Sequence, residues 1–588
     1  MKIKLLLTTF LIGACSIQAQ ELNQSSWLWS AKAENGMILE QLPLGFIDQN
    51  NNHFVVGNFR GETTTIQGTT LQNTSAPPVN NAIVGDTYIA KFDSNGALLN
   101  VLHFSGSKYE QITSIAYDGN NHYFISGSFS GDIHIGNNTF ESTTANASKV
   151  FLAKVTLDGN VVWAKEYPLY MGAVYLKYKN NNLYMAANYA YDQFPFDGLT
   201  LPVAGYNPTI PDMDKNMVAK LDPVNGNQIW TSSSRYTGVY TSVSSDRIGA
   251  QMRSMTVDNS GNVYVTGDFF SRSVTFGNVT LNRTSNTNGN VFYVKYDNTG
   301  AVVWAKTATI GASSDAKMFD VEVDSENSVY LVGAVYNSTI NFGGGTTLSF
   351  PGNYGAFMVK YNAAGNLVWA KKGGIATDQA PSTSLGSSWF KRLYIDAQDN
   401  IFVGGSFYRI LNMSPDFTYD LGPNFYSFLA KYNKSGAVQA CEIYQSAANG
   451  IGPMEVLNSD PNNFTILGTT SADLQLNNLT IETNQKQLVY IAKTGDSALG
   501  LAEFGTANFA AYPNPANDRL FIKNKEQLSD NALFTVYDLN GRQIFRLKGA
   551  DIGEKGIEVS KLAAGIYVLG VEDAQKQIKE YQKFVKNN

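Results

Sequence analysis

The sequence predicts an all-β protein: a seven-bladed β-propeller closed by an N-terminal strand, followed by a small C-terminal antiparallel β-sandwich. Three observations support this fold class. The 588 residues include 52 Gly, 32 Tyr and 33 Phe but only 16% charged residues, a composition that favours strands and turns. A hairpin motif recurs at intervals of 62 to 75 residues. The last copy lacks its final strand, and the N-terminus carries one additional strand that has no partner nearby in the sequence.

The N-terminus has the form of a secretory signal over residues 1–20, with two lysines, an apolar run and then small residues. We expect cleavage after Ala19. An alternative is that residues 12–15, "IGAC", resemble a lipobox, which would place a lipid on Cys15. No later segment reaches the roughly 20 apolar residues that a transmembrane helix needs, so no transmembrane span is predicted.

Each repeat contains two hairpins. The clearer one joins two apolar runs by an Asp/Asn–Gly turn, as in "VFYVKYDNTGAVVWAKT" (291–307) and "AFMVKYNAAGNLVWAKK" (356–372). A preceding hairpin reads "SMTVDNSGNVYVTGDF" (254–269), and a short extra segment such as "SVTFGNVTL" (273–281) lies between the two. The aligned lysines of the clearer hairpin are Lys91, Lys154, Lys220, Lys295, Lys360, Lys431 and Lys493. The repeat therefore predicts units of four antiparallel strands, as in a propeller.

The seventh unit, "VYIAKTGDSA" (489–498), stops after its third strand. The N-terminal stretch "WLWSAK" (27–32) matches the "VVWAK" of complete units, so we expect it to supply the fourth strand and leave no exposed edge. A solenoid is the alternative architecture, but it would need capping repeats, and the sequence shows none.

These repeats resemble those of secreted bacterial β-propellers with a "D-x-x-G-N-x-Y-x-x-G" motif, over approximately residues 25–498. The resemblance implies the fold and leaves the function open. We place the propeller domain at residues 21–498.

Several repeated or isolated residues have structural explanations. Tryptophans recur at one position of successive units, and we expect them to pack between blades rather than to form a ligand platform. The recurrent lysines are expected to keep their charged heads in solvent. Cys441 is expected to be a buried packing residue, because it lies in an apolar strand. The four tryptophans are Trp163, Trp230, Trp304 and Trp369.

No metal site, cofactor or catalytic motif is predicted. The four histidines form no H-E-x-x-H motif or histidine–carboxylate cluster. The stretch "DQNNNH" (48–53) starts like a calcium loop but lacks Gly at position six and Glu at position twelve. Weak Ca²⁺ binding at one of the turns stays open. A pair of catalytic carboxylates at the propeller axis also stays open, although the sequence nominates none.

Charge argues against nucleic acid as a partner. Residues 21–510 hold 29 basic and 39 acidic side chains, whereas a phosphate-binding surface needs the opposite balance.

Two long loop-containing segments, residues 232–251 and 374–392, are rich in Ser, Thr and aromatic residues. Long loops on a rigid scaffold are the usual place of ligand recognition. Surface loops without any binding role explain these segments equally well. The candidate ligand contacts are Tyr236, Tyr240, Arg247, Trp389 and Arg392.

The expected function is a secreted or surface binding and adhesion module for glycans or proteins. The alternative is a secreted propeller enzyme acting on glycan or peptide. Convergent carboxylates in a central pocket would favour the enzyme, whereas a lining of Ser, Thr, Tyr and backbone would favour binding.

After a linker at residues 499–510, the pattern changes to a small antiparallel sandwich over residues 511–588. This module resembles the type A C-terminal sorting domain of the type IX secretion system in Bacteroidota. The resemblance implies passage through the outer membrane by that machinery, and then surface attachment or release. It also argues against lipidation of Cys15. The matching residues are Tyr512, Pro513, Asn514, Pro515, Tyr537, Asp538, Asn540, Gly541, Leu562, Gly565, Ile566, Tyr567 and Lys583 to Lys586.

Overall fold

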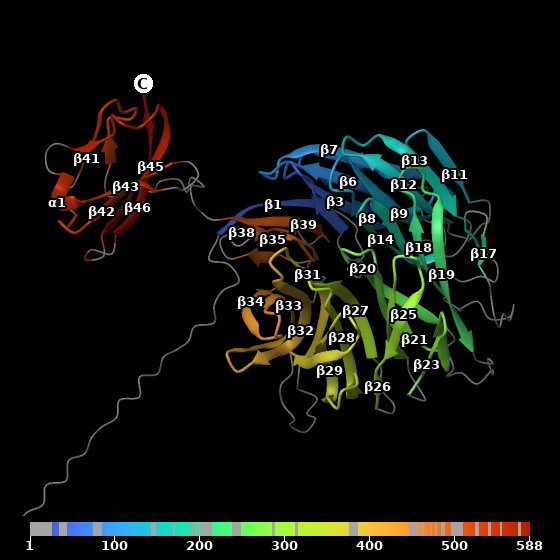
Figure 1. Cartoon of the computed structure of the whole chain (residues 1–588). Coiled ribbons are helices and arrows are strands. Elements are labelled where there is room, and N and C mark those ends of the chain that lie inside the picture. Colours follow the sequence, from blue (N-terminus) through green and yellow to red (C-terminus); the bar gives the residue numbers. More distant parts are fainter. Residues whose placement is uncertain are drawn as a thin grey trace, which may run out of the picture. The chain divides into compact units, whose positions relative to one another are not determined.

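A computed structural model of the chain divides into two units, Met1–Gly495 and Asp496–Asn588 (Figure 1). The predicted signal peptide, Cys15 and most of the linker lie outside the described residues. The boundaries proposed for the domains stay predictions. The structure describes residues 26–34, 44–74, 85–142, 149–167, 171–189, 194–196, 199–201, 215–237, 249–284, 289–311, 316–374, 386–445, 455–459, 464–471, 473–476, 479–483, 488–495, 510–523, 528–538, 543–552, 556–573, 575 and 578–587.

The first unit is built from antiparallel sheets that follow one another along the chain. One sheet holds β2 (Leu44–Ile47), β3 (His53–Phe59), β6 (Asp86–Phe92) and β7 (Leu98–Gly106). The next holds β8 (Tyr109–Tyr117), β9 (His122–Ser130), β12 (Lys149–Thr156) and β13 (Val161–Tyr167). A third holds β14 (Met171–Lys179), β15 (Asn182–Tyr189), β18 (Lys215–Leu221) and β19 (Gln228–Thr237).

The same plan continues toward the C-terminal end of this unit. A sheet of β20 (Ala250–Val257), β21 (Val263–Phe269), β24 (Asn290–Tyr296) and β25 (Val302–Thr307) comes first. It is followed by β27 (Ala316–Val323), β28 (Val329–Asn341), β29 (Thr347–Tyr361) and β30 (Leu367–Gly373), with β26 (Thr309–Ile310) beside β28. The next sheet comprises β31 (Ser387–Ile395), β32 (Ile401–Ser414), β33 (Phe417–Tyr432) and β34 (Val438–Gln445).

The expected extra segments form short hairpins between the two hairpins of several units. In the sheets that contain β28–β29 and β32–β33 they are instead continuous with these long strands, so those two hairpins are the longest. The short hairpins are β4 (Thr63–Ile66) with β5 (Thr69–Gln72), β10 (Asp132–Ile135) with β11 (Asn138–Glu141), β16 (Phe194–Phe196) with β17 (Leu199–Leu201), β22 (Ser273–Phe276) with β23 (Val279–Asn282), and β37 (Leu474–Leu476) with β38 (Leu479–Ile481).

The first strand of the chain pairs with the last strand of the same unit. β1 (Ser26–Glu34) lies antiparallel to β39 (Leu488–Gly495), and the sheet continues through β36 (Phe464–Thr470) to β35 (Glu455–Ser459). Trp29 lies opposite Lys493. This is the pairing that the match between "WLWSAK" and "VVWAK" predicts.

Neighbouring sheets share hydrophobic cores. Ala31 and Val489, from the sheet of β1 and β39, are buried in one cluster with Val55 and Tyr88 from the sheet of β3 and β6. The first strands also contact one another in succession, from β2 through β8, β14, β20, β27 and β31 to β35, and β35 contacts β2. Figure 1 shows several of these first strands toward the middle of the unit. The sheets therefore present their first strands to a common centre and bury their faces against one another.

The recurrent tryptophans pack between sheets, as expected. Trp163 Nε1 donates a hydrogen bond to Pro223 O at 3.3 Å, in a turn of the following sheet. Trp29 Nε1 does the same to Ser94 O at 3.0 Å, so β1 makes the inter-sheet contact that is typical of a fourth strand. Cys441 is buried in a hydrophobic cluster, also as expected.

The prediction that the recurrent lysines keep their heads in solvent is wrong for Lys295 and Lys360. Lys360 Nζ lies 4.8 Å from the centre of the Tyr330 ring, and both Lys360 and Lys295 are buried. The lysine and the ring lie on one face of adjacent strands, where a cation is attracted to the aromatic face. The same placement recurs for Lys91, Lys154, Lys220, Lys295 and Lys431.

The second unit has two antiparallel sheets around a core that includes Leu520, Val536 and Leu569. The short helix α1 (Gly549–Ile552), which the sequence does not predict, follows β43. One sheet holds β40 (Ala510–Tyr512), β41 (Arg519–Lys523) and β44 (Ile557–Glu558). The other holds β42 (Leu533–Tyr537), β43 (Gln543–Lys548), β45 (Gly565–Asp573) and β46 (Ile578–Lys586).

Candidate functional site

The first strands carry β-bulges, which re-aim side chains toward the centre of the unit. The register shifts by one residue between Met318 and Asp320 in β27, and equivalent shifts occur in β20 and β31. Asp320 accepts a hydrogen bond from Ser254 Oγ at 2.5 Å and another from Leu393 N at 2.8 Å. Asp320 thus links its own strand to the first strands of the sheets on both sides.

A cavity of about 570 Å³ opens where four of these strands end. It is lined by the last residues of β14, β20, β27 and β31 and by the turns that follow three of these strands. Its volume lies within the range of small-molecule sites. The polar lining residues are Lys177, Lys179, Thr256, Asp258, Asn259, Glu322, Asp324, Ser325, Asp396 and Asp399.

Charged side chains from different first strands face one another at this centre. Lys177 Nζ lies 3.1 Å from Glu322 Oε1, and the Thr256 hydroxyl donates to Glu322 Oε2 at 2.7 Å. The Glu322 carboxylate raises the pKa of Lys177. Burial raises the pKa of Glu455 above its usual value, against the lowering effect of Arg392 and Lys177. Carboxylates from β27 and β35 therefore gather at the centre in different electrostatic environments.

Three of the turn aspartates that line the cavity, Asp258, Asp324 and Asp396, accept hydrogen bonds from backbone N–H groups of their own turns. Asp258 Oδ1 accepts hydrogen bonds from the backbone N–H of Ser260 and Asn262, at 2.8 and 2.9 Å. Asp48, in the calcium-like stretch, accepts from two backbone N–H groups in the same way. These contacts satisfy the carboxylates as turn caps. Among the described residues, no group of three His, Cys, Asp or Glu side chains is placed to hold a metal ion.

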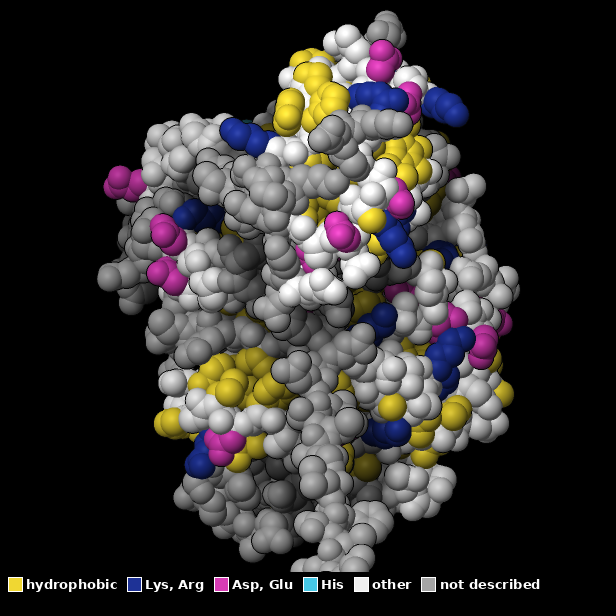
Figure 2. All heavy atoms as spheres, turned by 90° about the vertical axis from the view of Figure 1, so that its left-hand side faces the viewer, with side chains coloured by type: hydrophobic (Ala, Val, Ile, Leu, Met, Phe, Trp, Pro, Cys, Tyr) yellow, Lys and Arg dark blue, Asp and Glu magenta, His cyan; other side chains and the backbone are white. Residues whose placement is uncertain are grey.

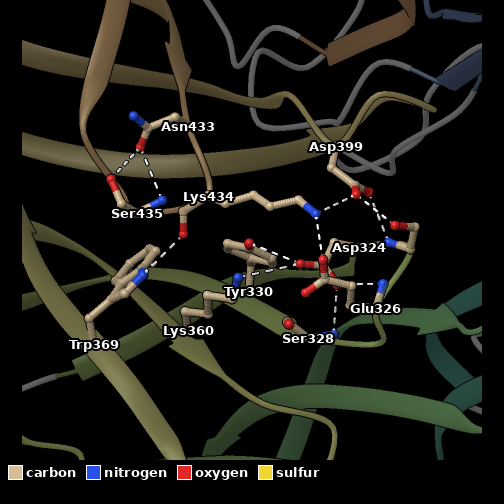
Figure 3. A network of polar contacts seen from close by, with 11 residues as sticks. Asp324, Glu326, Ser328, Tyr330, Lys360, Trp369, Asp399, Asn433, Lys434 and Ser435 are labelled. Carbon is tan, nitrogen blue, oxygen red and sulfur yellow. Dashed lines mark hydrogen bonds and ion pairs between the residues drawn. The ribbon is translucent and has the colours of Figure 1, made fainter.

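A polar network joins the turns of the sheets that contain β27 and β31 (Figure 3). Lys434 Nζ lies 2.8 Å from Asp399 Oδ2 and 3.0 Å from Glu326 Oε1. Partial burial raises the pKa of Asp399, but hydrogen bonds from Lys434 and Ser325 outweigh this effect and lower it. Trp369 Nε1 donates to Lys434 O at 3.3 Å. The network joins the turns at the rim of the cavity and pairs the Asp399 and Glu326 carboxylates with Lys434.

Two of the five predicted contact residues, Tyr240 and Arg247, lie outside the described residues. Tyr236 lies in β19, opposite Val274 of β22. Arg392 lies in β31 near the centre, with its guanidinium 3.8 Å from Asp320 Oδ2. Trp389, three residues earlier in the same strand, contacts a different set of side chains.

Trp389 belongs to a row of five aromatic side chains, which we call the aromatic strip: Tyr336, Tyr354, Trp389, Phe425 and Tyr408. Successive ring centres are 4.8, 5.5, 6.2 and 5.1 Å apart in that order. The strip crosses from the β28–β29 hairpin to the sheet of β31, β32 and β33. It lies at the ends of the strands opposite to the turns that border the cavity.

The strip is partly open to solvent. Tyr336 is 41% exposed and Phe425 38% exposed, and Leu421 beside the strip is also exposed. The sequence pointed to Trp389 alone, because the other four rings read as ordinary strand residues of the long hairpins. Figure 2 shows hydrophobic side chains gathered in patches on one face of the molecule, with Lys, Arg, Asp and Glu interspersed.

The predicted sorting residues lie within the second unit, apart from Asn540 and Gly541, which are outside the described residues. Pro513 and Pro515 are exposed after β40, and between them Asn514 Oδ1 accepts a hydrogen bond from Val585 N at 2.9 Å. The Tyr567 hydroxyl donates to Ala563 O, and its ring stacks on Phe584. Gly565 begins β45 opposite the buried Lys586 of β46.

Residues 510–587 match the family model of the secretion system C-terminal sorting domain. The second unit is a type IX sorting domain. The protein is therefore secreted across the outer membrane, to the cell surface or beyond, and the domain implies interaction with the secretion machinery. None of the helices in the described part of the chain is long and apolar enough to cross a membrane.

No curated protein matches the chain. Among solved structures, one similar protein is PorZ of Porphyromonas gingivalis, which is described as an essential bacterial surface component of the type IX secretion system. It is 11% identical, and the match covers 95% of this chain and 100% of PorZ with a TM-score of 0.24. An ulvan lyase is 10% identical over 79% of this chain and 94% of its own, with a TM-score of 0.42. The rhamnogalacturonan lyase YesW is 11% identical over 94% and 91%, with a TM-score of 0.27. Similarities this distant assign no activity to this chain.

Proposed function

We propose that the first unit is a seven-bladed propeller closed by β1, and that it serves as a binding or adhesion module on or outside the cell that exports it. The pairing of β1 with β39 and the contact of β35 with β2 support the closed ring. We further propose that residues 1–20 are a removed signal, that the domains have the boundaries predicted above, and that the producing organism belongs to the Bacteroidota.

The aromatic strip is the observation that carries the binding function. Soluble proteins seldom leave rows of large aromatic side chains exposed unless a partner covers them. Tyr and Trp also supply rigid contact area with a polar end, and they are enriched where proteins bind other molecules. Trp389 is in the strip. Residues 232–237 and 387–392 of the two predicted loop segments lie in β19 and β31, not in loops.

The test is saturable binding of the labelled full chain to intact cells and to isolated extracellular polymer. We expect Trp389→Ala to weaken this binding at least about tenfold. The matched control is Val303→Ala, which removes an exposed apolar side chain, 52% exposed, from another sheet. Non-saturable binding of the wild type, or equal binding by Trp389→Ala, would contradict the proposal.

A second candidate is an enzyme acting on glycan or peptide, favoured by the carboxylates at the centre. Burial raises the pKa of Glu455, whereas the Glu322 carboxylate lies 3.1 Å from Lys177 Nζ. Two carboxyl groups in different surroundings can act as acid and base. Hydrolysis by the wild type that is lost in both Glu322→Gln and Glu455→Gln would support this function, and retained hydrolysis in either variant would count against it.

A further inference from the structure

We infer that the aromatic strip binds an extended, uncharged glycan chain, whose sugar rings stack on Trp389 and Phe425. This inference rests on the proposed binding function and names the class of ligand. Three features of the strip carry it: the spacing and tilt of its rings, the balance of charge beside it, and the rigidity of the strands that hold it.

The strip is a row of partly exposed rings on neighbouring strands rather than one enclosed pocket. The planes of Trp389 and Phe425 differ by only 24°, with ring centres 6.2 Å apart. The Tyr354 ring is tilted by 40° from Trp389, and Tyr336 continues the row on the neighbouring hairpin. A ligand made of repeating rings can contact several of these side chains in succession, whereas a compact small molecule would reach only one or two of them.

The faces of aromatic rings are electron-rich and attract partly positive C–H groups. A pyranose ring in the chair form presents such C–H groups on its flat faces and directs its hydroxyls to the sides. The hydroxyls then need hydrogen-bonding groups beside the aromatic row. Arg409, next to Tyr408, and Asp420, opposite Ile410 in the same hairpin, form a partly exposed ion pair at 3.4 Å. Together they offer both donors and an acceptor.

The charge beside the strip points to an uncharged ligand. Arg409 and Asp420 neutralise each other, so this pair adds no excess of positive charge with which to attract a sulfated or uronic-acid glycan. Residues 21–510 also carry more acidic than basic side chains, which disfavours polyanions in general.

The strands hold the strip rigidly. Trp389 lies opposite Ser406 in the β31–β32 ladder, and Tyr408 lies opposite Phe425 in the β32–β33 ladder. Tyr336 and Tyr354 are also direct partners across β28 and β29. Rings fixed by paired strands lose little freedom when a ligand binds, which favours recognition of a regular chain.

The test is co-sedimentation of the full chain with three insoluble uncharged polysaccharides: cellulose, chitin and β-1,4-mannan. We expect binding to at least one of them. Trp389→Ala and Phe425→Ala should each weaken it at least about tenfold, and Val303→Ala should leave it unchanged. Far-UV circular dichroism establishes that the variants fold. If Trp389→Ala does not, Phe425→Ala and the exposed Tyr336→Ala decide the outcome.

The inference is overturned if the wild type binds none of the three polysaccharides, if the strip variants bind as well as the wild type, or if dextran sulfate binds more tightly than the uncharged polymers. Treating target cells with periodate or with protease separates the two proposals. Loss of binding after protease treatment alone would agree with the proposed binding function but would contradict a glycan as the ligand. Self-association that Phe425→Ala abolishes would instead identify a second copy of the chain as the occupant.

Discussion

At the scale of single residues, the buried carboxyl group of Glu110 in the first unit stays protonated at neutral pH. Glu110 in β8 is 1% exposed, and burial raises its pKa to about 9, with a further contribution from the Asp86 carboxylate. Asp86 is ionised beside it, and His103 Nε2 lies 2.7 Å from Asp86 Oδ2. The Thr74 hydroxyl donates to the same oxygen at 3.0 Å.

This arrangement predicts that Glu110 lowers stability as the pH rises. In the unfolded chain a glutamate ionises near pH 4.3, whereas in the folded chain Glu110 stays protonated to about pH 9. Between these values the unfolded state releases a proton that the folded state keeps, so stability falls by about 1.4 kcal/mol per pH unit. The favourable effect of the raised pKa is therefore complete below pH 4 and is lost toward pH 9.

Replacing Glu110 by glutamine removes this titration. We expect the free energy of unfolding of the wild type, relative to Glu110→Gln, to fall by about 4 kcal/mol between pH 5 and pH 8. Urea denaturation at the two pH values measures it. The exposed Glu141→Gln is the control and should show no such change. Parallel pH dependence of the wild type and Glu110→Gln would show that Glu110 is ionised in the folded protein.

At the scale of strands, one contact is repeated between sheets: a tryptophan covers the turn glycine of the next sheet. A Cβ on Gly96 would lie 2.5 Å from the Trp29 ring, and one on Gly300 would lie 2.6 Å from Trp230. Both glycines also have positive φ, at 82° and 86°, so the turn and the packing require glycine for separate reasons.

Trp29 is therefore expected to fasten β1 to the sheet of β3 and β6. Trp29→Ala should lower the free energy of unfolding by about 2–4 kcal/mol, since it removes a large, partly buried ring. Leu28→Ala, in the same strand but 44% exposed, should change it by less than about 0.5 kcal/mol. Chemical denaturation of both variants checks this. Deleting residues 21–33 should destabilise the unit more than Trp29→Ala, and an unchanged melting temperature would contradict the closing role of β1.

At the scale of the whole molecule, export and the proposed binding belong to different units. Each unit has its own hydrophobic core, with Leu520 and Val536 in the second and the repeated clusters in the first. The sorting domain determines how the protein is exported, and it gives no information on which ligand the first unit binds.

Deleting residues 511–588 should leave the first unit folded but trapped in the periplasm. The reason is that the sorting domain is the part recognised by the secretion machinery, while the first unit keeps its own core. Cell fractionation and immunoblotting against the first unit measure the location, with the full chain in the same strain as the control. Display of the truncated protein on the surface would contradict the sorting role.

Much of this fold could be predicted from local pattern. Alternating apolar residues identified the strands, Asp/Asn–Gly pairs identified the turns, and the unmatched "WLWSAK" identified the partner of β39. These signals depend on neighbouring residues or on a repeated spacing, which sequence displays directly. The placement of Lys360 over Tyr330 was missed because the repeat shows that the lysine alternates with buried residues, but not what covers its face.

By itself, the sequence determined the all-β class of fold, the pairing of the two ends of the first unit and the C-terminal sorting domain. Only the tertiary structure decided which side chains meet. Asp320, Glu322 and Glu455 gather at the centre because first strands more than 60 residues apart converge there, and Trp389 meets Tyr354 because β31 packs against the β28–β29 hairpin. Such contacts depend on how the sheets pack, and the local sequence around these residues does not differ from that of other strand residues.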